Sequence, residues 1–333
     1  MNYIGSKQSL MGFLTDTITD VVGTETQGKV FADLFAGTGA VGTEFKRKGY
    51  RVIANDIQEY SFVLNRHLIQ NVPPVKIEIL DYLNELKGTE GFIYKNYCAG
   101  SGSGRQYFTD ENGKKCDAIR IELNELKRSG EIDESQYYFL LASLINSIDK
   151  YANTASVYGA FLKKVKKSAA KEFELELLPI IDGDKESKAY KDNITNLIKG
   201  IGGDILYMDP PYNARQYCTN YHVLETIALY DNPVLRGKTG LRDYTEQKSA
   251  FCSKRTVVDA FDEVLRNAEF NYIFLSYNNE GLMDFNTIRK TMEKYGEYQQ
   301  FSTDYKRFKA DIDENRNYSA DKTTEYLHCL IKK

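Results

Sequence analysis

Several residue types on which metal, redox and secreted proteins depend are scarce in this 333-residue chain, which has no tryptophan, three histidines and five cysteines. The cysteines are widely spaced and form no Cys-x-x-Cys pair; they are Cys98, Cys116, Cys218, Cys252 and Cys329. A disulfide framework and a tetrahedral zinc site are therefore not expected. With so few histidines, we also expect no chemistry built on several imidazoles, and no bound metal.

The sequence also lacks an excess of one charge and a long apolar run. Its 44 basic and 47 acidic side chains give a net charge of −3, which argues against binding nucleic acid or membrane through bulk charge. A locally basic groove remains compatible with this balance. The longest nearly unbroken apolar run, residues 137–145, is too short to cross a bilayer. Because the N-terminus also has no signal-peptide core, we expect a cytoplasmic protein without membrane association.

Hydrophobic patterning predicts an α/β fold that one long segment interrupts. Strands are predicted at residues 29–35, 51–55, 204–208, 271–276 and 325–331. Helical patterns alternate with them in the first 25 residues and at 41–49, 60–70, 220–230 and 257–267. From 81 to 182 the alternation stops, and helices are predicted at 117–127 and 136–151. We therefore expect a doubly wound, mainly parallel sheet from residues 1–81 and 186–333, with a mainly helical inserted region at 82–185.

The first motif follows the first predicted strand and reads Asp33-Leu-Phe-Ala-Gly37-Thr-Gly39-Ala-Val-Gly42, with Asp56 closing the next strand. Such a G-x-G-x-x-G turn lets backbone approach a ligand, and the later acid holds ribose hydroxyls. Asp33 is awkward beside a pyrophosphate, because like charges repel, but it suits a cationic ligand. S-adenosylmethionine offers a sulfonium, an ammonium and a ribose. An ordinary βαβ turn with a surface Asp is the alternative that this segment alone leaves open.

The second motif, Asp209-Pro210-Pro211-Tyr212, comes directly after the apolar strand at 204–208. The strand places it at the carboxyl edge of the sheet, where open α/β sheets bind ligands. The prolines fix the backbone and remove two N–H donors, so the Pro210 carbonyl is free to act as an acceptor. Asp209 adds a second acceptor, and Tyr212 adds a flat ring. Two fixed acceptors and a stacking face suit the exocyclic amino group of a flipped base.

With both motifs in this order, the sequence resembles the DNA adenine-N6 methyltransferases of the alpha motif order (the D12 class), in their restriction-modification branch. Its other matching segments are Asn2–Lys7, similar to the N-terminal cofactor motif, and the later motifs at 275–278, 305–309 and 325–327. The resemblance implies a Rossmann-like, S-adenosylmethionine-dependent methyltransferase fold. It also implies that the inserted region recognises the DNA target.

The resemblance assigns roles to particular residues. The catalytic residues would be Asp209, Pro210, Pro211 and Tyr212. Contacts to S-adenosylmethionine would come from Tyr3, Lys7, Asp33, Phe35, Gly37, Thr38, Gly39, Asp56, Ile57, Asn193 and Asp209. Asn193 stands for an acid that the family places shortly before the catalytic strand, to accept from the cofactor's adenine amine; here Asp192 is the alternative.

The expected chemistry is direct methyl transfer to an exocyclic amine. Asp209 and the Pro210 carbonyl would accept both N6 hydrogens and draw the nitrogen toward tetrahedral geometry, a matter of positioning and aimed dipoles. Tyr212 is the expected stacking partner of the flipped base, while Tyr217 and Tyr221 more often serve in a helix face or core. Cytosine-C5 methylation is disfavoured because it needs a cysteine nucleophile, and no cysteine here follows a proline.

Double-stranded DNA is the expected partner, and a cognate restriction endonuclease acting on the same site would accompany this branch. Residues 150–171 contain no acid, and Lys163, Lys164, Lys166 and Lys167 are the candidate phosphate contacts. A second candidate surface is the loop 232–255, with Arg236, Lys238, Arg242, Lys254 and Arg255. A merely solvated basic face is the alternative for both.

Other functions would explain some of the same motifs. Methylation of cytosine N4 or of RNA adenine would need the same chemistry. An NAD-dependent dehydrogenase would share the glycine turn but leaves Asp33 and Asp209-Pro-Pro-Tyr unexplained. A DNA-binding module without activity would not need that tetrapeptide.

Overall fold

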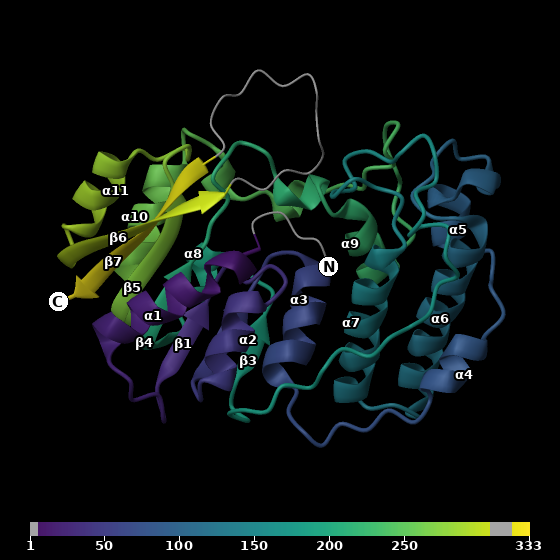
Figure 1. Ribbon diagram of the computed structural model, residues 1–333, viewed down its shortest axis with the longest axis horizontal. Coiled ribbons are helices and arrows are strands. Elements are labelled where there is room, and N and C mark those ends of the chain that lie inside the picture. The colour runs from purple at the N-terminus through teal and green to yellow at the C-terminus, as the bar shows by residue number, and fades with distance from the viewer. Residues whose placement is uncertain (1–5, 307–321) are drawn as a thin grey trace.

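The computed structural model describes residues 6–306 and 322–333. Figure 1 shows two parts side by side, a sheet flanked by helices and a separate group of helices. Tyr3, expected at the cofactor, and residues 307–309 of a later motif lie outside the described residues. Among the residues described, no helix is both long and apolar enough to cross a membrane.

The sheet has seven strands in the order β3-β2-β1-β4-β5-β7-β6. Their bounds are β1 (Val30–Asp33), β2 (Arg51–Asn55), β3 (Lys188–Tyr190), β4 (Gly202–Met208), β5 (Glu269–Asn278), β6 (Gly296–Lys306) and β7 (Lys322–Lys332). Strands β1 to β5 pair in parallel, whereas β7 runs antiparallel to both β5 and β6. The chain leaves β1 toward β2 on one side and returns to β4 on the other. The carboxyl ends of β1 and β4 therefore form the topological switch point where open α/β sheets bind ligands.

Both faces of the sheet are buried, which explains the nearly continuous apolar strands. Because side chains alternate along a strand, Phe31 and Tyr207 pack in one core and Ala32 and Met208 in the other. The first core is closed by α1 (Met11–Val22) and α2 (Ala40–Arg47), and the second by α8 (Ile194–Leu197), α10 (Val257–Asn267) and α11 (Phe285–Met292).

A third hydrophobic core lies among the helices, and one of these helices, α3, also contacts β2 and β3 of the sheet. Its helices are α3 (Glu59–Asn65), α4 (Leu80–Glu85), α5 (Phe92–Tyr97), α6 (Asp110–Ser129), α7 (Glu134–Lys150) and α9 (His222–Leu229). In the sequence, α3 comes before the inserted region 82–185 and α9 comes after it. The two helices nevertheless contact each other and α7. In Figure 1, α7 and α9 lie between α3 and the helices α5 and α6.

The expected α/β fold, with its sheet and helical segment, is confirmed, and most predicted elements are present. The sequence patterns missed elements that are short or lack an apolar stripe: β3, α4, α5, α8, α11 and β6. Helix α6 also begins earlier than predicted, at Asp110, because the Thr109 side chain accepts a hydrogen bond from the Asn112 N–H and caps its first turn.

Candidate active site

The glycine turn sits between β1 and α2, as its spacing predicted. Gly37 and Gly39 have φ values of 52° and 78°, a left-handed conformation that side chains rarely adopt. A Cβ on Gly39 would also lie 2.8 Å from Oδ1 of Asn65. Asn65 donates through Nδ2 to the Gly37 carbonyl at 3.0 Å, so α3 holds the turn in place.

Asp56 fastens the end of β2 to this turn. Its Oδ2 accepts the Gly37 N–H at 2.9 Å, and its Oδ1 accepts the Gln58 N–H at 3.0 Å. Burial raises the pKa of Asp56, and these two N–H groups partly offset that effect. The carboxylate is thus a positioned acceptor beside the glycine turn.

Asp33 ends β1 and is only 1% exposed. Among the described residues, its Oδ1 has no hydrogen-bond partner. Burial, followed by the nearby charge of Asp209, raises the pKa of Asp33 to about 8, although the Gly42 N–H opposes the shift. A buried, incompletely paired acid is costly, and a cationic ligand would relieve that cost.

Asp209 belongs to a compact group of charged and polar side chains that includes Lys7, Tyr212 and Glu325. Nζ of Lys7 lies 3.0 Å from both Asp209 Oδ1 and Glu325 Oε1 and also contacts the Tyr212 hydroxyl. That hydroxyl lies 2.7 Å from the same two carboxylate oxygens. Ser276 donates to Glu325 Oε1 at 2.8 Å. Segments from the N-terminus, β4, β5 and β7 therefore meet at one point.

The protonation of this group follows from its burial and its neighbours. Burial lowers the pKa of Lys7, but Asp209 and Glu325 outweigh it and hold the pKa above the ordinary value, so Lys7 stays cationic. Burial raises the pKa of Asp209 to about 6; Lys7 lowers it, while the like charge of Glu325 raises it. Near neutral pH Asp209 is therefore mostly ionised. Glu325 lies in the matched segment 325–327, but sequence reasoning assigned it no role; its contacts with Lys7 and Tyr212 show that it belongs to the site.

The ring of Tyr212 is partly covered. Lys7 Nζ lies 4.9 Å from its centroid, and the Tyr277 ring contacts it edge to face at 5.1 Å. Tyr221 is a core residue with no exposed surface, whereas Tyr217 lines the neighbouring pocket.

An open pocket lies beside this group. Of the residues expected to contact the cofactor, it is lined by Phe35, Gly37, Asp56, Ile57, Asn193 and Asp209. The other described ones do not line it: Lys7, Asp33, Thr38 and Gly39. Of the catalytic tetrapeptide, Asp209 and Pro211 are pocket residues, and Pro210 is buried.

Asp192 and Asn193 both line the pocket. The Asn193 side chain caps α8, since its Oδ1 accepts from the N–H and the hydroxyl of Thr195 at 3.1 and 3.0 Å. Asp192 Oδ1 accepts the Asn193 N–H at 2.6 Å. A carboxylate has two acceptor oxygens, so Asp192 keeps more acceptor capacity than Asn193.

Sequence reasoning missed one wall of the pocket, the strap formed by residues 247–252. Gln216 holds it with a pair of hydrogen bonds to Ser249, from Nε2 to the carbonyl at 3.3 Å and from the Ser249 N–H to Oε1 at 2.9 Å. This strap belongs to the loop 232–255 that we expected to face DNA. Its pocket role had no sequence signal, because it depends on contacts with α9 and the catalytic loop.

Most of the basic residues predicted to contact DNA are exposed: Lys163, Lys164, Lys167, Arg236 and Lys238. Lys166 is half-buried and donates to the Thr154 carbonyl at 2.8 Å. The expectation for Arg242 is wrong, because this side chain is buried and forms a two-pronged ion pair with Asp231.

The two basic segments lie close to each other because both dock on residues 105–107. Arg105 donates to the carbonyls of Gly237 and Lys238 at 3.1 and 3.2 Å. Gln106 donates to those of Leu162 and Lys163 at 3.3 and 3.4 Å. Lysines and an arginine that are far apart in sequence therefore share one region of the surface.

Taken together, the doubly wound sheet with its antiparallel β7 and the acids gathered at the carboxyl ends of β1 and β4 define a Rossmann-like methyltransferase. Residues 3–291 match the family of D12 class N6 adenine-specific DNA methyltransferases, and the chain belongs to this family.

Curated relatives agree with this assignment. The chain is 54% identical to the type II methyltransferase M.NlaIII of Neisseria lactamica, over all of this chain and 99% of that protein. It is 36% identical to M.CviAII of Paramecium bursaria Chlorella virus 1, over 94% of each. It is 38% identical to M.FokI of Planomicrobium okeanokoites, where the chain spans 53% of a longer protein. These relatives are consistent with the modification part of a restriction-modification system.

Solved structures show only remote similarity. Magnesium protoporphyrin IX methyltransferase of Synechocystis with bound S-adenosylmethionine is 8% identical, with a TM-score of 0.34 over 98% of this chain and 79% of that one. Precorrin 8W decarboxylase of Methanobacterium thermoautotrophicum is 10% identical, with a TM-score of 0.34 over 96% and 89%. Values this low carry no argument about function.

Proposed function

We propose that the chain moves the methyl group of S-adenosylmethionine to N6 of an adenine flipped out of duplex DNA, at a specific sequence. The observation that carries this proposal is the position of Asp209-Pro210-Pro211-Tyr212. The motif follows β4 at the switch point of the sheet, and Asp209 lines a pocket that Asp56 and the glycine turn also line.

The pocket fits S-adenosylmethionine in its donor set, because Asp56, Asp192 and Asp209 all line it. Asp33, with its unpaired buried oxygen, would become ionised when a ligand that carries an ammonium and a sulfonium binds. Asp56 would accept from the ribose hydroxyls, and Asp192, rather than Asn193, would accept from the adenine amine. When bound, this cofactor supplies an electrophilic methyl group.

Asp209 and Pro210 would prepare the target amine. Lys7 and Tyr212 both contact Asp209 through Oδ1, which leaves Oδ2 for one N6 hydrogen, and the Pro210 carbonyl would take the other. These acceptors would draw the nitrogen toward tetrahedral geometry and make its lone pair available. With a pKa of about 6, Asp209 is also suited to take up the proton that N6 loses.

Duplex DNA would bind across the basic surface formed by Lys163, Lys164, Lys167, Arg236 and Lys238. These residues are exposed and docked together through residues 105–107. Phosphate contacts of this kind fix the position of the duplex without reading its sequence. Given type II relatives, we propose that a cognate restriction endonuclease acts on the same site.

Nucleoside mass spectrometry on unmethylated plasmid DNA tests the proposal. After incubation with the purified chain and S-adenosylmethionine, we expect N6-methyladenine, and sequencing of the modified positions would give the site. N4-methylcytosine alone would agree with methyl transfer to an exocyclic amine but would contradict adenine as the target base. Absence of both products on DNA, with methylation of RNA adenine, would contradict the DNA substrate.

A further inference from the structure

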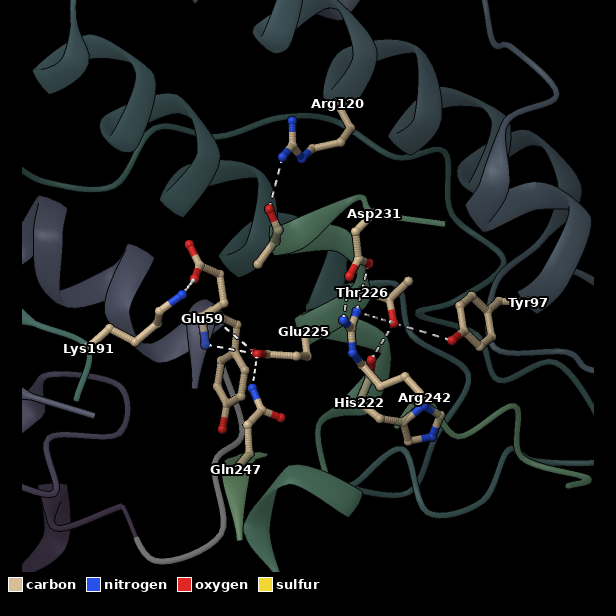
Figure 2. A network of polar contacts seen from close by, with 12 residues as sticks. Glu59, Tyr97, Arg120, Lys191, His222, Glu225, Thr226, Asp231, Arg242 and Gln247 are labelled. Atoms are coloured by element: carbon tan, nitrogen blue, oxygen red, sulfur yellow. Dashed lines mark hydrogen bonds and ion pairs between the residues drawn. The ribbon is translucent and has the colours of Figure 1, made fainter. Parts of the chain in front are cut away.

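Glu225 is a buried acid that the chemistry above does not use. It lies on α9, which follows the catalytic loop, and its side chain is only 1% exposed. Its two oxygens accept three hydrogen bonds from two separate segments of the chain (Figure 2). Burial raises the pKa of Glu225, while the N–H donors oppose that shift.

The first of these segments is the start of α3. Glu225 Oε1 and Oε2 accept the backbone N–H groups of Glu59 and Tyr60, each at 3.0 Å. Those N–H groups have no partner within the helix. They directly follow Asp56, Ile57 and Gln58, which line the pocket. Glu225 therefore fixes the point at which the predicted ribose-binding segment enters α3.

The second segment is the strap, residues 247–252. Gln247 donates to Glu225 Oε1 through Nε2. A carboxylate offers only acceptors, so this contact turns the amide oxygen of Gln247 away from Glu225. Gln247 lines the pocket, and its Oε1 is buried without a hydrogen-bond partner among the described residues. The strap is thus anchored at Gln247 on Glu225 and at Ser249 on Gln216.

From these contacts we infer that Glu225 is a positioning residue for the cofactor. One carboxylate orders two walls of the pocket: the segment after β2 and the strap. This inference rests on the proposed use of S-adenosylmethionine.

The helical part of the molecule contains a matched control. Asp117 on α6 accepts the backbone N–H groups of Ile93 and Tyr94, in the first turn of α5, at 2.9 and 2.8 Å, and the Tyr230 hydroxyl at 2.6 Å. It is as buried as Glu225, and burial raises its pKa as well. Asp117 is not a lining residue of the pocket. Changing either acid to its amide removes the same kind of support from one short helix.

The test compares Glu225→Gln and Asp117→Asn by isothermal titration of S-adenosylmethionine, thermal unfolding and steady-state kinetics. We expect both variants to lower the melting temperature similarly. Glu225→Gln should weaken cofactor affinity about tenfold, equal to about 1.4 kcal/mol. Its KM for the cofactor should rise, while kcat at saturating cofactor and KM for DNA stay within twofold. Asp117→Asn should leave cofactor affinity within twofold of wild type.

Equal cofactor affinity in wild type and Glu225→Gln, with a lowered melting temperature, would overturn the inference, because Glu225 would then only stabilise the fold. Gln247→Leu tests the strap without changing the hydrogen bonds to α3. It removes the hydrogen bond to Glu225, so we expect a fivefold to tenfold loss of cofactor affinity and a lowered melting temperature. Unchanged affinity would mean that the anchored strap does not position the cofactor. A wild-type chain that binds no S-adenosylmethionine would instead refute the proposed function.

Discussion

The sheet and the helical part bury their acids in different ways. In the helical part, Asp117 accepts three hydrogen bonds. The neighbouring buried cation, Arg120, is likewise paired, since it donates to the carbonyls of Ile227 and Ala228 at 2.8 and 2.9 Å. At the sheet edge, Asp33 keeps an oxygen unpaired among the described residues, and Asp209 shares Lys7 with Glu325. Buried polar groups are normally satisfied. The contrast indicates that Asp117 supports the fold, while Asp33 and Asp209 are kept ready for ligands.

The largest effect should come from the sheet edge. Asp209→Ala removes the acceptor for the target amine, and we expect methyl transfer to fall by about 10³-fold. Binding of duplex DNA should stay within a few-fold of wild type, because the proposed phosphate contacts come from Lys163, Lys164, Lys167, Arg236 and Lys238 and not from Asp209. Single-turnover transfer of labelled methyl groups and a filter-binding assay measure the two quantities. Near-normal turnover would contradict the catalytic assignment.

The basic surface offers the next contrast, since changes there should alter the affinity for DNA and leave the affinity for the cofactor unchanged. Changing Lys163, Lys164 and Lys167 together to Ala should weaken DNA binding at least tenfold at low salt. The slope of log affinity against log salt should become shallower by up to about 3, about one for each lost phosphate contact. Titrations at several salt concentrations measure this. An unchanged slope would mean that these lysines form a merely solvated face.

A change at Asp33 should alter the affinity for the cofactor and leave the affinity for DNA unchanged. Asp33→Asn removes the charge that we expect to face the cationic cofactor, so S-adenosylmethionine affinity should fall about tenfold. S-adenosylhomocysteine lacks the sulfonium charge and serves as the control ligand. Its affinity should fall less, and equal losses for both ligands would show that Asp33 does not respond to that charge.

A smaller effect should appear in the pH dependence of kcat/KM. Asp209 acts in its ionised form, so kcat/KM should rise with pH through the pKa of about 6. Glu325 raises that pKa by like-charge repulsion. Glu325→Gln should therefore move the rise to lower pH. Rates on a short duplex between pH 5 and pH 8 test this, and a shift to higher pH would show that Glu325 acts differently.

The sequence predicted those parts of the site that depend on local order. Asp33, Asp56 and Asp209 each close or follow an apolar strand, and parallel strands bring their carboxyl ends together. Contacts between distant segments left no such pattern. Glu325 is 318 residues from Lys7, and Glu225 is 166 residues from Glu59, so their roles became visible only once the chain was folded.

The loop 232–255 shows the same limit in one segment. Its composition suggested a basic surface throughout. Packing against α9 and the catalytic loop instead buries Arg242 and places residues 247–252 on the pocket, while Arg236 and Lys238 remain exposed. Charge alone could not separate these roles, because the division depends on Asp231, Glu225 and Gln216 as partners.

The central claim, that the sheet edge holds its acids ready for a cationic cofactor, is tested most directly by calorimetric titration of S-adenosylmethionine at pH 7 in buffers of different ionisation enthalpy. In the free protein the pKa of Asp33 is about 8, so the acid is mostly protonated at pH 7. A bound cation favours the ionised form. The account predicts that binding releases a fraction of a proton and tightens as the pH rises toward 8, and that Asp33→Asn abolishes both effects. Binding that exchanges no proton and does not change with pH would contradict it.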